Sequence, residues 1–453
     1  MVKVAMIGAG SLSFTRRLVM DILSVPELQD TEFSLMDIHE ENLRMVAEVC
    51  EHIVLKHRLP ARIVSTTDRS EAIRGADYVV VTIRVGGMEA FNHDIQIPLK
   101  YGVEQCVGDT LGPGGVFYHL RTIPVMLDIC KDIRELAPNA LLLNYTNPMA
   151  MNTWAIHRAG GVRVLGLCHG VQHTHRQIAE VLGVPHQELE YIAAGINHQT
   201  WFVHLSHRGR NMLPHLLHAY EAHPTIAVKE PCRIDVLRRF GFYSTESNGH
   251  LSEYLPWYRK NREEIKKWSY SGAMSGGETG GYFRFCMERR DEYVKSLPKW
   301  LSGEEGSLEL GERTVEHASF IIEALETGRP YRGHFNVKNE GMIANLPNDS
   351  IVEIPCYVDK SGIHPVKVGR LPLACAATCR ASISVQEMAV EAALTGNREL
   401  VKLAVLHDPL TAAVCTTEQV WQLCDEMFEK LAPWLPQFNG EGRTWADIPN
   451  PGL

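Results

Sequence analysis

This 453-residue chain lacks paired cysteines at the spacings typical of disulfide scaffolds or zinc sites. It has eleven cysteines, an odd number, scattered from Cys50 to Cys424 without any Cys-x-x-Cys pair. This distribution excludes a secreted disulfide scaffold and favours a reducing compartment, so we expect a cytoplasmic protein. The apolar run Val4–Ile7 near the N-terminus is too short for a signal peptide. No stretch approaches the roughly 20 apolar residues that span a bilayer, so we expect no membrane partner.

The chain also lacks a surplus of basic residues. Its 45 Lys and Arg residues face 54 Asp and Glu residues, which gives a formal net charge of -9. Because binding to a phosphate backbone depends on positive charge, we expect no nucleic-acid partner. Hydrophobic residues make up 45% and charged residues 22% of the chain, as in ordinary globular proteins. The length predicts about two domains.

The first two hundred residues alternate short apolar runs with helical patterns. The predicted strands are Val2–Ile7, Glu32–Asp37, Arg62–Ser65, Tyr78–Thr82, Ala140–Asn144 and Val162–Leu167. Helical patterns between them include Glu41–Leu55 and Val116–Leu136, the second with an expected kink at Pro124. Alternating elements of this kind predict an α/β fold, a Rossmann-type doubly wound parallel sheet covered by helices on both faces.

The regular alternation ends near Gly195. Beyond it we expect an α+β domain with helices at Thr314–Glu326, Val385–Leu394 and Glu418–Leu431, and extended runs at Arg332–Val337, Ile351–Val358 and Pro365–Val368. The predicted domains are therefore 1–195, which would bind a dinucleotide, and 196–453, which would bind substrate and metal and form oligomer contacts. The glycine-rich segment Ser269–Tyr282 is interpreted as a loop that acts as a lid or simply as a linker.

A dinucleotide-binding turn follows the first predicted strand. Gly8 permits a sharp turn, Gly10 lets the backbone approach a pyrophosphate, and Ser11 precedes the helix that would face the phosphate. Asp37 closes the second strand, where an acid accepts hydrogen bonds from a ribose diol, so the pattern favours NAD over NADP. Ser13 stands where a third glycine is usual, and a tight turn that binds nothing is the alternative.

Four further segments carry residues suited to chemistry. Asp109 lies in a glycine-dense loop, Asn147 and Cys168 follow predicted strands, and His198 ends the run Tyr191–Gly195. Ligand contacts gather at the carboxyl ends of such strands. A thiolate and an imidazole could bind a divalent transition metal or form a nucleophilic pair, whereas a buried core cysteine is the simpler alternative. From these residues alone the chain would be interpreted as an oxidoreductase like malate or lactate dehydrogenase.

Taken together, the segments resemble glycoside hydrolase family 4, the NAD-dependent glycosidases with a fold related to lactate and malate dehydrogenases. The motifs that carry the resemblance occur in the family's order: Gly8-Ala9-Gly10-Ser11, Asp109 to Gly115, Asn144 to Met149, Cys168-His169-Gly170, Asn197-His198, Asn345-Leu346-Pro347 and Val352-Glu353-Ile354-Pro355. The chain looks most like the bacterial α-galactosidases within that family, through Leu111 to Gly115, Met149 to Trp154 and Ser252 to Trp257. Gly170 departs from the serine usual in those enzymes and occurs in relatives that act on α-glucosides and α-glucuronides.

The resemblance implies a hydrolysis in which NAD+ oxidises sugar C3, a base removes the C2 proton, the anomeric group is eliminated, water adds, and the hydride returns. It implies NAD and Mn2+ as cofactors, with Cys168 and His198 as metal ligands and Asn147 as a substrate contact. Tyr254 corresponds to the C2 base, with Tyr258 as a nearby rival. Either His169 or Asp109 would protonate the leaving group. Relatives suggest a homodimer or homotetramer.

Three functions therefore remain open at the level of sequence. The first is an α-galactosidase, or a family member that acts on α-glucosides, α-glucuronides or α-galacturonides. The second is an NAD-dependent dehydrogenase of a hydroxy acid or polyol. The third is a non-catalytic NAD-binding protein, which would require the segments around Cys168, His198 and Tyr254 to be incidental.

Overall fold

The computed structural model describes residues 1–270, 274–302 and 308–438. Its centre is one twisted mixed sheet of thirteen strands in the order β10-β8-β7-β12-β11-β6-β5-β4-β1-β2-β3, with β13 added to β12 and β9 added to β8. The parallel strands are β1 (Lys3–Ile7), β2 (Glu32–Met36), β3 (Arg62–Thr66), β4 (Tyr78–Val81), β5 (Leu141–Asn144) and β6 (Arg163–Gly166). All six lie where the sequence predicts them. Their order, 3-2-1-4-5-6, is that of the Rossmann fold.

The antiparallel half of the sheet comes from the second part of the chain. Its strands are β7 (Leu189–Ile196), β8 (Gln199–His207), β9 (Arg210–Asn211), β10 (Tyr243–Ser244), β11 (Tyr331–Lys338), β12 (Ile351–Asp359) and β13 (Gly362–Pro365). It joins the parallel half where Asn336 of β11 pairs with Gly166 of β6. The predicted boundary at residue 195 falls inside β7, and the division into two domains stays a prediction.

Helices cover both faces of the parallel strands. In the first part of the chain the helices are α1 (Leu12–Leu23), α2 (Glu40–Lys56), α3 (Arg69–Ile73), α4 (Gly87–Lys100), α5 (Gly112–Leu136), α6 (Met149–Ala159) and α7 (Gly170–Leu182). Helix α7 packs instead with β7, β8 and α8. The 3-10 turns along the chain are η1 (Pro26–Leu28), η2 (His186–Glu188), η3 (Met274–Gly276), η4 (Ala432–Trp434) and η5 (Pro436–Phe438). Strands β4 and β5 are entirely buried, as expected for parallel strands covered on both sides.

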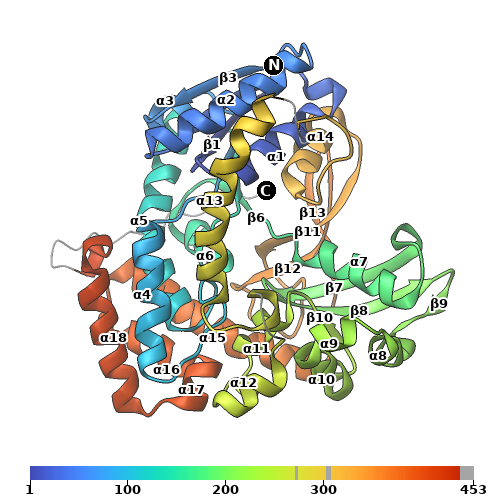
Figure 1. Ribbon diagram of the computed structural model, residues 1–453, viewed down its shortest axis with the longest axis vertical. Helices are drawn as coiled ribbons and strands as arrows, with labels where there is room; N and C mark the ends of the chain where they lie inside the picture. Colours follow the sequence, from blue (N-terminus) through green and yellow to red (C-terminus); the bar gives the residue numbers. More distant parts are fainter. Residues whose placement is uncertain (271–273, 303–307, 439–453) are drawn as a thin grey trace.

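The remaining helices follow β9. They are α8 (Leu213–Ala222), α9 (Ile226–Lys229), α10 (Pro231–Phe240), α11 (Asn248–Tyr254), α12 (Arg262–Trp268), α13 (Gly281–Ser302), α14 (His317–Thr327), α15 (Leu373–Thr395), α16 (Arg398–His407), α17 (Pro409–Val414) and α18 (Thr417–Leu431). Helices α15 and α18 pack against α5 and α4 of the first part. Strands β7 to β10 with helices α7 to α10 occupy the lower right of the view (Figure 1). Within the described residues, no helix combines the length and apolar character needed to cross a membrane.

Several predicted elements have different bounds in the structure. Helix α5 begins at Gly112 rather than Val116, because Pro113 suits a first helical turn and Asp408 accepts a hydrogen bond from the Gly112 amide at 3.1 Å. Helix α14 begins at His317 rather than Thr314. The predicted helix Val385–Leu394 is the C-terminal part of α15, which begins at Leu373. The extended run predicted at Pro365–Val368 is wrong, because β13 forms a hairpin with β12 and ends at Pro365.

Part of the Ser269–Tyr282 loop, residues 271–273, lies outside the described residues. Its described part is tied to the body of the protein: the Gly280 amide donates to the Gln105 carbonyl at 2.8 Å, and the Tyr282 amide donates to the Cys106 carbonyl at 3.3 Å. Whether this segment acts as a lid stays a prediction.

Candidate active site

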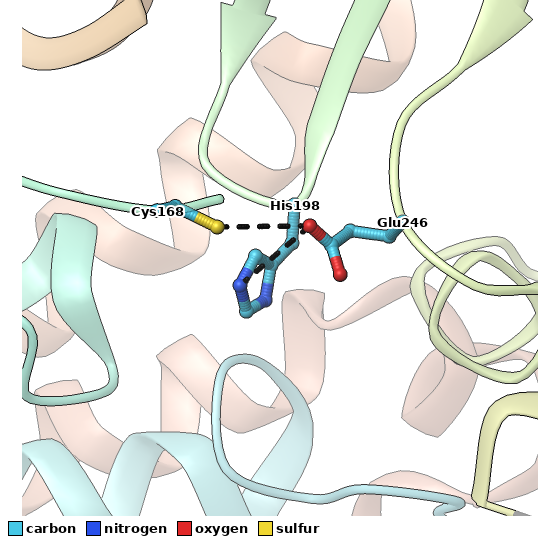
Figure 2. A group of neighbouring side chains, drawn as sticks. All are labelled: Cys168, His198 and Glu246. Carbon is cyan, nitrogen blue, oxygen red and sulfur yellow. Dashed lines mark hydrogen bonds and ion pairs between the residues drawn. The ribbon is translucent and has the colours of Figure 1, made fainter. Parts of the chain in front are cut away.

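Three side chains from distant parts of the chain point toward one another at the carboxyl edge of the sheet. Cys168 follows β6, His198 lies in the two-residue turn between β7 and β8, and Glu246 follows β10 (Figure 2). Both His198 and Glu246 have left-handed backbone conformations, with φ of 61° and 73°. Such conformations are uncommon for residues other than glycine and concentrate at functional sites.

The donor atoms of these three residues are close enough to share one ion. Sγ of Cys168 lies 3.7 Å from Oε1 of Glu246, and Nε2 of His198 lies 4.0 Å from the same oxygen. One ligand atom from each residue falls within 4.8 Å of those of the other two. Thiolate, imidazole and carboxylate together are a donor set for a divalent transition metal. The structure thus brings together the two predicted ligands, thirty residues apart.

The charges at this cluster also fit a cation. Burial raises the pKa of the Cys168 thiol well above its usual range, and the charge of Glu246 adds to the rise. Burial opposes ionisation of Glu246 as well, but the imidazoles of His198 and His250 outweigh it and lower the pKa of Glu246 to about 2. A divalent ion would favour the thiolate and offset the buried negative charge, since metals bind the deprotonated ligand.

The other nitrogen of His198 is held by hydrogen bonds. Nδ1 lies 3.0 Å from the Thr110 hydroxyl, which donates its own proton to Asp109 at 2.8 Å. Thr110 must therefore accept the Nδ1 proton, which assigns the tautomer with an unprotonated Nε2. That nitrogen is the one that faces Cys168 and Glu246. Asp109 and Thr110 thus orient His198 as carboxylate partners orient metal-bound histidines.

Tyr254 belongs to the same network. It ends helix α11, is buried, and places its hydroxyl 3.2 Å from Nδ1 of His198. Burial, followed by the charges of Glu253 and Asp109, raises the pKa of Tyr254 well above its usual range. A base at this position would need a cation close by. The rival Tyr258 points elsewhere and donates to Asp235 at 3.1 Å.

Two predicted residues complete one side of the network. The Asn147 amide donates to Oδ2 of Asp109 at 3.0 Å, and Oδ1 of Asp109 accepts from Thr110. Asn147 comes from the loop after β5, and Asp109 from the loop before α5. Both oxygens of Asp109 therefore accept hydrogen bonds, which fix the carboxylate between Asn147 and Thr110.

His169 pairs with a carboxylate outside the candidate metal-binding cluster. Its Nδ1 lies 2.8 Å from Oε1 of Glu316, and half of its side chain is exposed (50%). Glu316 is partly buried and precedes α14. His169 and Glu316 therefore form a pair, whereas Asp109 accepts its hydrogen bonds from Thr110 and Asn147.

The dinucleotide-binding turn has the predicted backbone. Gly8 has φ of 86°, and a Cβ there would lie 2.5 Å from the Thr82 carbonyl oxygen, so this position accepts only glycine. Ser11 caps α1, whose first turn faces the carboxyl edge of the sheet. Asp37 accepts hydrogen bonds from the amides of Gly10 at 2.7 Å and His39 at 2.9 Å. The turn after β1 and the candidate metal-binding cluster of Cys168, His198 and Glu246 thus lie at the same edge of the parallel sheet.

Sequence reasoning missed three residues at this edge. Glu246 contacts both predicted ligands, Glu316 holds His169, and Arg84 lies 4.5 Å above the Phe91 ring with Nη1 unpaired. None of them belongs to a recognisable motif. The one signal was Gly170, because the missing side chain leaves the space that the Glu246 carboxylate occupies.

A Rossmann-type sheet with a nucleotide-binding turn and a thiolate–imidazole–carboxylate cluster at one edge defines an enzyme class in which a dinucleotide and a metal can act at one site. The sequence assigns the chain more closely. It belongs to the family 4 glycosyl hydrolases: the family's sequence profile matches residues 3–184, and the profile of the family's C-terminal domain matches residues 193–411.

Individual relatives match along nearly the whole chain. An α-galactosidase of Rhizobium meliloti is 57% identical over 96% of this chain and 89% of its own length. An α-galactosidase of Bacillus subtilis is 35% identical over 97% of this chain and 100% of its own. The Bacillus subtilis protein lplD is similar in structure, with a TM-score of 0.82, 26% identity, and coverage of 94% and 99%. A 6-phospho-beta glucosidase of Thermotoga maritima, solved with manganese, NAD+ and glucose-6-phosphate, shares the fold at a TM-score of 0.78, 24% identity, and coverage of 96% and 99%.

Proposed function

We propose that this protein hydrolyses α-galactosides with NAD and Mn2+ as cofactors. The observation that carries the proposal is the 57% identity to an α-galactosidase over 96% of the chain, in a structure that gathers Cys168, His198 and Tyr254 at one site. The substrate would be a small α-glycoside whose sugar ring lies between the nicotinamide and this cluster.

The residues present fit both cofactors. Cys168 and His198 would hold Mn2+, and the turn of Gly8, Gly10 and Ser11 would hold the pyrophosphate, with Asp37 turning from the Gly10 amide to the ribose. When bound, NAD accepts a hydride from sugar C3 and returns it, and Mn2+ polarises the C3 oxygen as a Lewis acid.

The side chains of this protein then move the protons. The phenolate oxygen of Tyr254 would take the C2 proton, and it lies beside the protonated Nδ1 of His198, which would stabilise the phenolate. Asn147, held by Asp109, orients a sugar hydroxyl. The anomeric group leaves by elimination across C1 and C2, and water later adds at C1.

The proton for the leaving group comes from His169 in this proposal. Both oxygens of Asp109 accept hydrogen bonds, from Thr110 and Asn147, so we assign Asp109 as a positioning residue. His169 is half exposed, and Glu316 holds its Nδ1, which leaves Nε2 available to a departing oxygen.

The proposal is tested by an omission assay on the purified protein. We expect hydrolysis of p-nitrophenyl α-galactoside to require NAD+, Mn2+ and a thiol reductant, without accumulation of NADH. Accumulation of NADH with a hydroxy acid or polyol would establish the dehydrogenase instead. Absence of turnover with every substrate, with NAD bound, would establish a non-catalytic NAD-binding protein.

Gly170 supports a second candidate substrate class, because a glycine after the Cys-His pair is also typical of relatives that act on other sugars. Alpha-galacturonidases are 28–29% identical to the chain. A panel of aryl α-galactoside, α-glucoside, α-glucuronide and α-galacturonide decides between them. We expect the highest kcat/KM for the galactoside. A higher kcat/KM for a uronide would replace the α-galactoside as the proposed substrate.

The same proposal includes location and assembly. Eleven cysteines are free, which suits the cytoplasm. A homodimer or homotetramer would cover exposed apolar side chains of α13 such as Phe285 and Met287. Light scattering of the purified protein measures the assembly directly, and a monomer at micromolar concentration would contradict it.

A further inference from the structure

We infer that Glu246 is a third protein ligand of the metal, beside Cys168 and His198. The inference rests on the proposed function, since it concerns the same ion. Its first support is position: Oε1 of Glu246 is the atom that links the other two donors, 3.7 Å from Sγ of Cys168 and 4.0 Å from Nε2 of His198 (Figure 2). These separations allow one ion to contact all three side chains.

The second support is the space above Gly170. A Cβ on this residue would lie 1.8 Å from Oε1 of Glu246, closer than any non-bonded contact. Gly170 is also the first residue of α7 and is not among the glycines with a positive φ, so its backbone conformation does not require glycine. The carboxylate therefore occupies room that exists only because position 170 has no side chain. This relationship ties Glu246 to the Cys168 loop.

The third support is that Glu246 forms no ion pair with an Arg or Lys side chain in the described part of the chain. Glu246 is largely buried, and its ion-pair partners among the described residues are imidazoles, His198 and His250, each at 4.0 Å. Buried carboxylates are costly unless a cation or several hydrogen bonds satisfy them. A divalent ion held by the thiolate of Cys168 and the carboxylate of Glu246 would be neutralised by its ligands.

The carboxylate also suits the metal chemistry. Cys and His alone select zinc or copper, whereas a carboxylate oxygen is a ligand that manganese prefers. Three protein ligands are the usual number at a catalytic site that keeps open positions for substrate oxygens. Glu246 would therefore strengthen Mn2+ binding and leave room for sugar hydroxyls.

The test is Mn2+ binding to the purified full-length protein, measured by electron paramagnetic resonance without NAD or substrate. We expect Glu246→Gln to weaken Mn2+ binding by about 10- to 100-fold, in the range seen for lost metal-site partners. Gly170→Ala keeps every charge but displaces the carboxylate, and we expect it to weaken binding to a similar degree. Glu188→Gln removes a surface carboxylate that pairs with Arg208, and it should bind like the wild type.

Cobalt substitution separates the inference that Glu246 is a third ligand from the proposal that Cys168 and His198 hold the metal. The Co2+–thiolate absorption band should persist in Glu246→Gln and Gly170→Ala and disappear in Cys168→Ser. Wild-type Mn2+ affinity in both Glu246→Gln and Gly170→Ala, with loss in Cys168→Ser, would overturn the third ligand and leave the proposed function intact. Wild-type affinity in Cys168→Ser as well would place the metal elsewhere and contradict both. Thermal unfolding checks that each variant is folded. Glu246→Gln and Gly170→Ala must weaken Mn2+ binding to a similar degree, because both take the same carboxylate away from the ion.

Discussion

The hydroxyl of Tyr254 lies 3.2 Å from Nδ1 of His198, whose other nitrogen faces Cys168 and Glu246. The proposed base therefore touches a proposed metal ligand through the imidazole ring. Carboxylates surround Tyr254, and burial keeps its proton in place, so the hydroxyl becomes a useful base only when positive charge is near. Metal binding and proton abstraction are coupled by this contact.

Replacing Tyr254 tests that coupling. We expect Tyr254→Phe to lower kcat for an aryl α-galactoside by about 100- to 10,000-fold, the usual contribution of a general base. Mn2+ affinity should change little, because Thr110 still holds Nδ1 of His198. Exchange of the C2 proton with deuterated solvent, followed by NMR, should be lost in the same variant.

Tyr258→Phe is the matched control. Its hydroxyl bonds Asp235 rather than the site, so the rate of C2 exchange should stay within about twofold of the wild type, as for other changes away from the reacting groups. If Tyr258→Phe abolishes exchange and Tyr254→Phe does not, the assignment of the base is wrong.

Replacing Cys168 tests the separation of the metal and nucleotide sites. Cys168→Ser should reduce Mn2+-dependent hydrolysis by about 100-fold or more, because a hydroxyl is a poor substitute for a thiolate ligand. NAD binding, followed by fluorescence titration, should stay near the wild-type value, since Gly8, Gly10 and Asp37 lie on other loops. A comparable loss of NAD affinity would show that the two sites are not independent.

Replacing His169 tests the leaving-group acid. His169→Gln should slow methyl α-galactoside, whose alkoxide leaves poorly, by at least about tenfold more than p-nitrophenyl α-galactoside, whose leaving group needs little protonation. Asp109→Asn should instead weaken Mn2+ binding, because Asp109 orients His198 through Thr110. If Asp109→Asn shows the leaving-group dependence and His169→Gln does not, the acid is Asp109.

The acid stability of the fold should depend on buried histidines. Burial lowers the pKa of His119 to about 4, below the usual value near 6.5. Between these pH values the unfolded state binds the proton and the folded state does not. The contribution of His119 to the free energy of unfolding is therefore complete above pH 6.5 and is lost as pH falls toward 4. This one group contributes a slope of at most about 1.4 kcal/mol per pH unit.

Urea titrations of His119→Gln at several pH values measure that slope. The variant lacks the group that titrates, so the free energy of unfolding should fall less steeply between pH 6.5 and 4 than in the wild type. The absolute stability at pH 7 should also drop, because His119 bonds Asn152 at 2.9 Å. An unchanged slope would mean that His119 holds its proton in the folded state.

Much of this site follows from local sequence. Buried parallel strands give apolar runs, so β1, β2, β4, β5 and β6 are predicted nearly to the residue, and the residues at their carboxyl ends follow; the sixth strand, β3, is an exposed edge strand. Cys168 and Asn147 come directly after such strands. Parallel strands end at one edge, so their convergence could be predicted from topology alone.

The rest depends on contacts that no local pattern encodes. Glu246 follows a two-residue strand that pairs only with β8, and it reaches Cys168 across 78 residues. In the first half of α15 the buried side chains include small or polar ones, Cys375, Cys379 and Ser382, which weaken the hydrophobic period that identifies a helix in a sequence. The start of α5 at Gly112 was missed because glycines suggest a loop, whereas Asp408 from a distant segment caps that turn.

The central claim is that Cys168 and His198 hold the metal beside the nicotinamide. Anomalous diffraction from crystals grown with NAD+ and Mn2+, collected at the manganese edge, tests it most directly. We predict one strong peak bonded to Sγ of Cys168 and Nε2 of His198, next to the nicotinamide ring. A peak elsewhere in the protein, with none between these two atoms, would contradict the account.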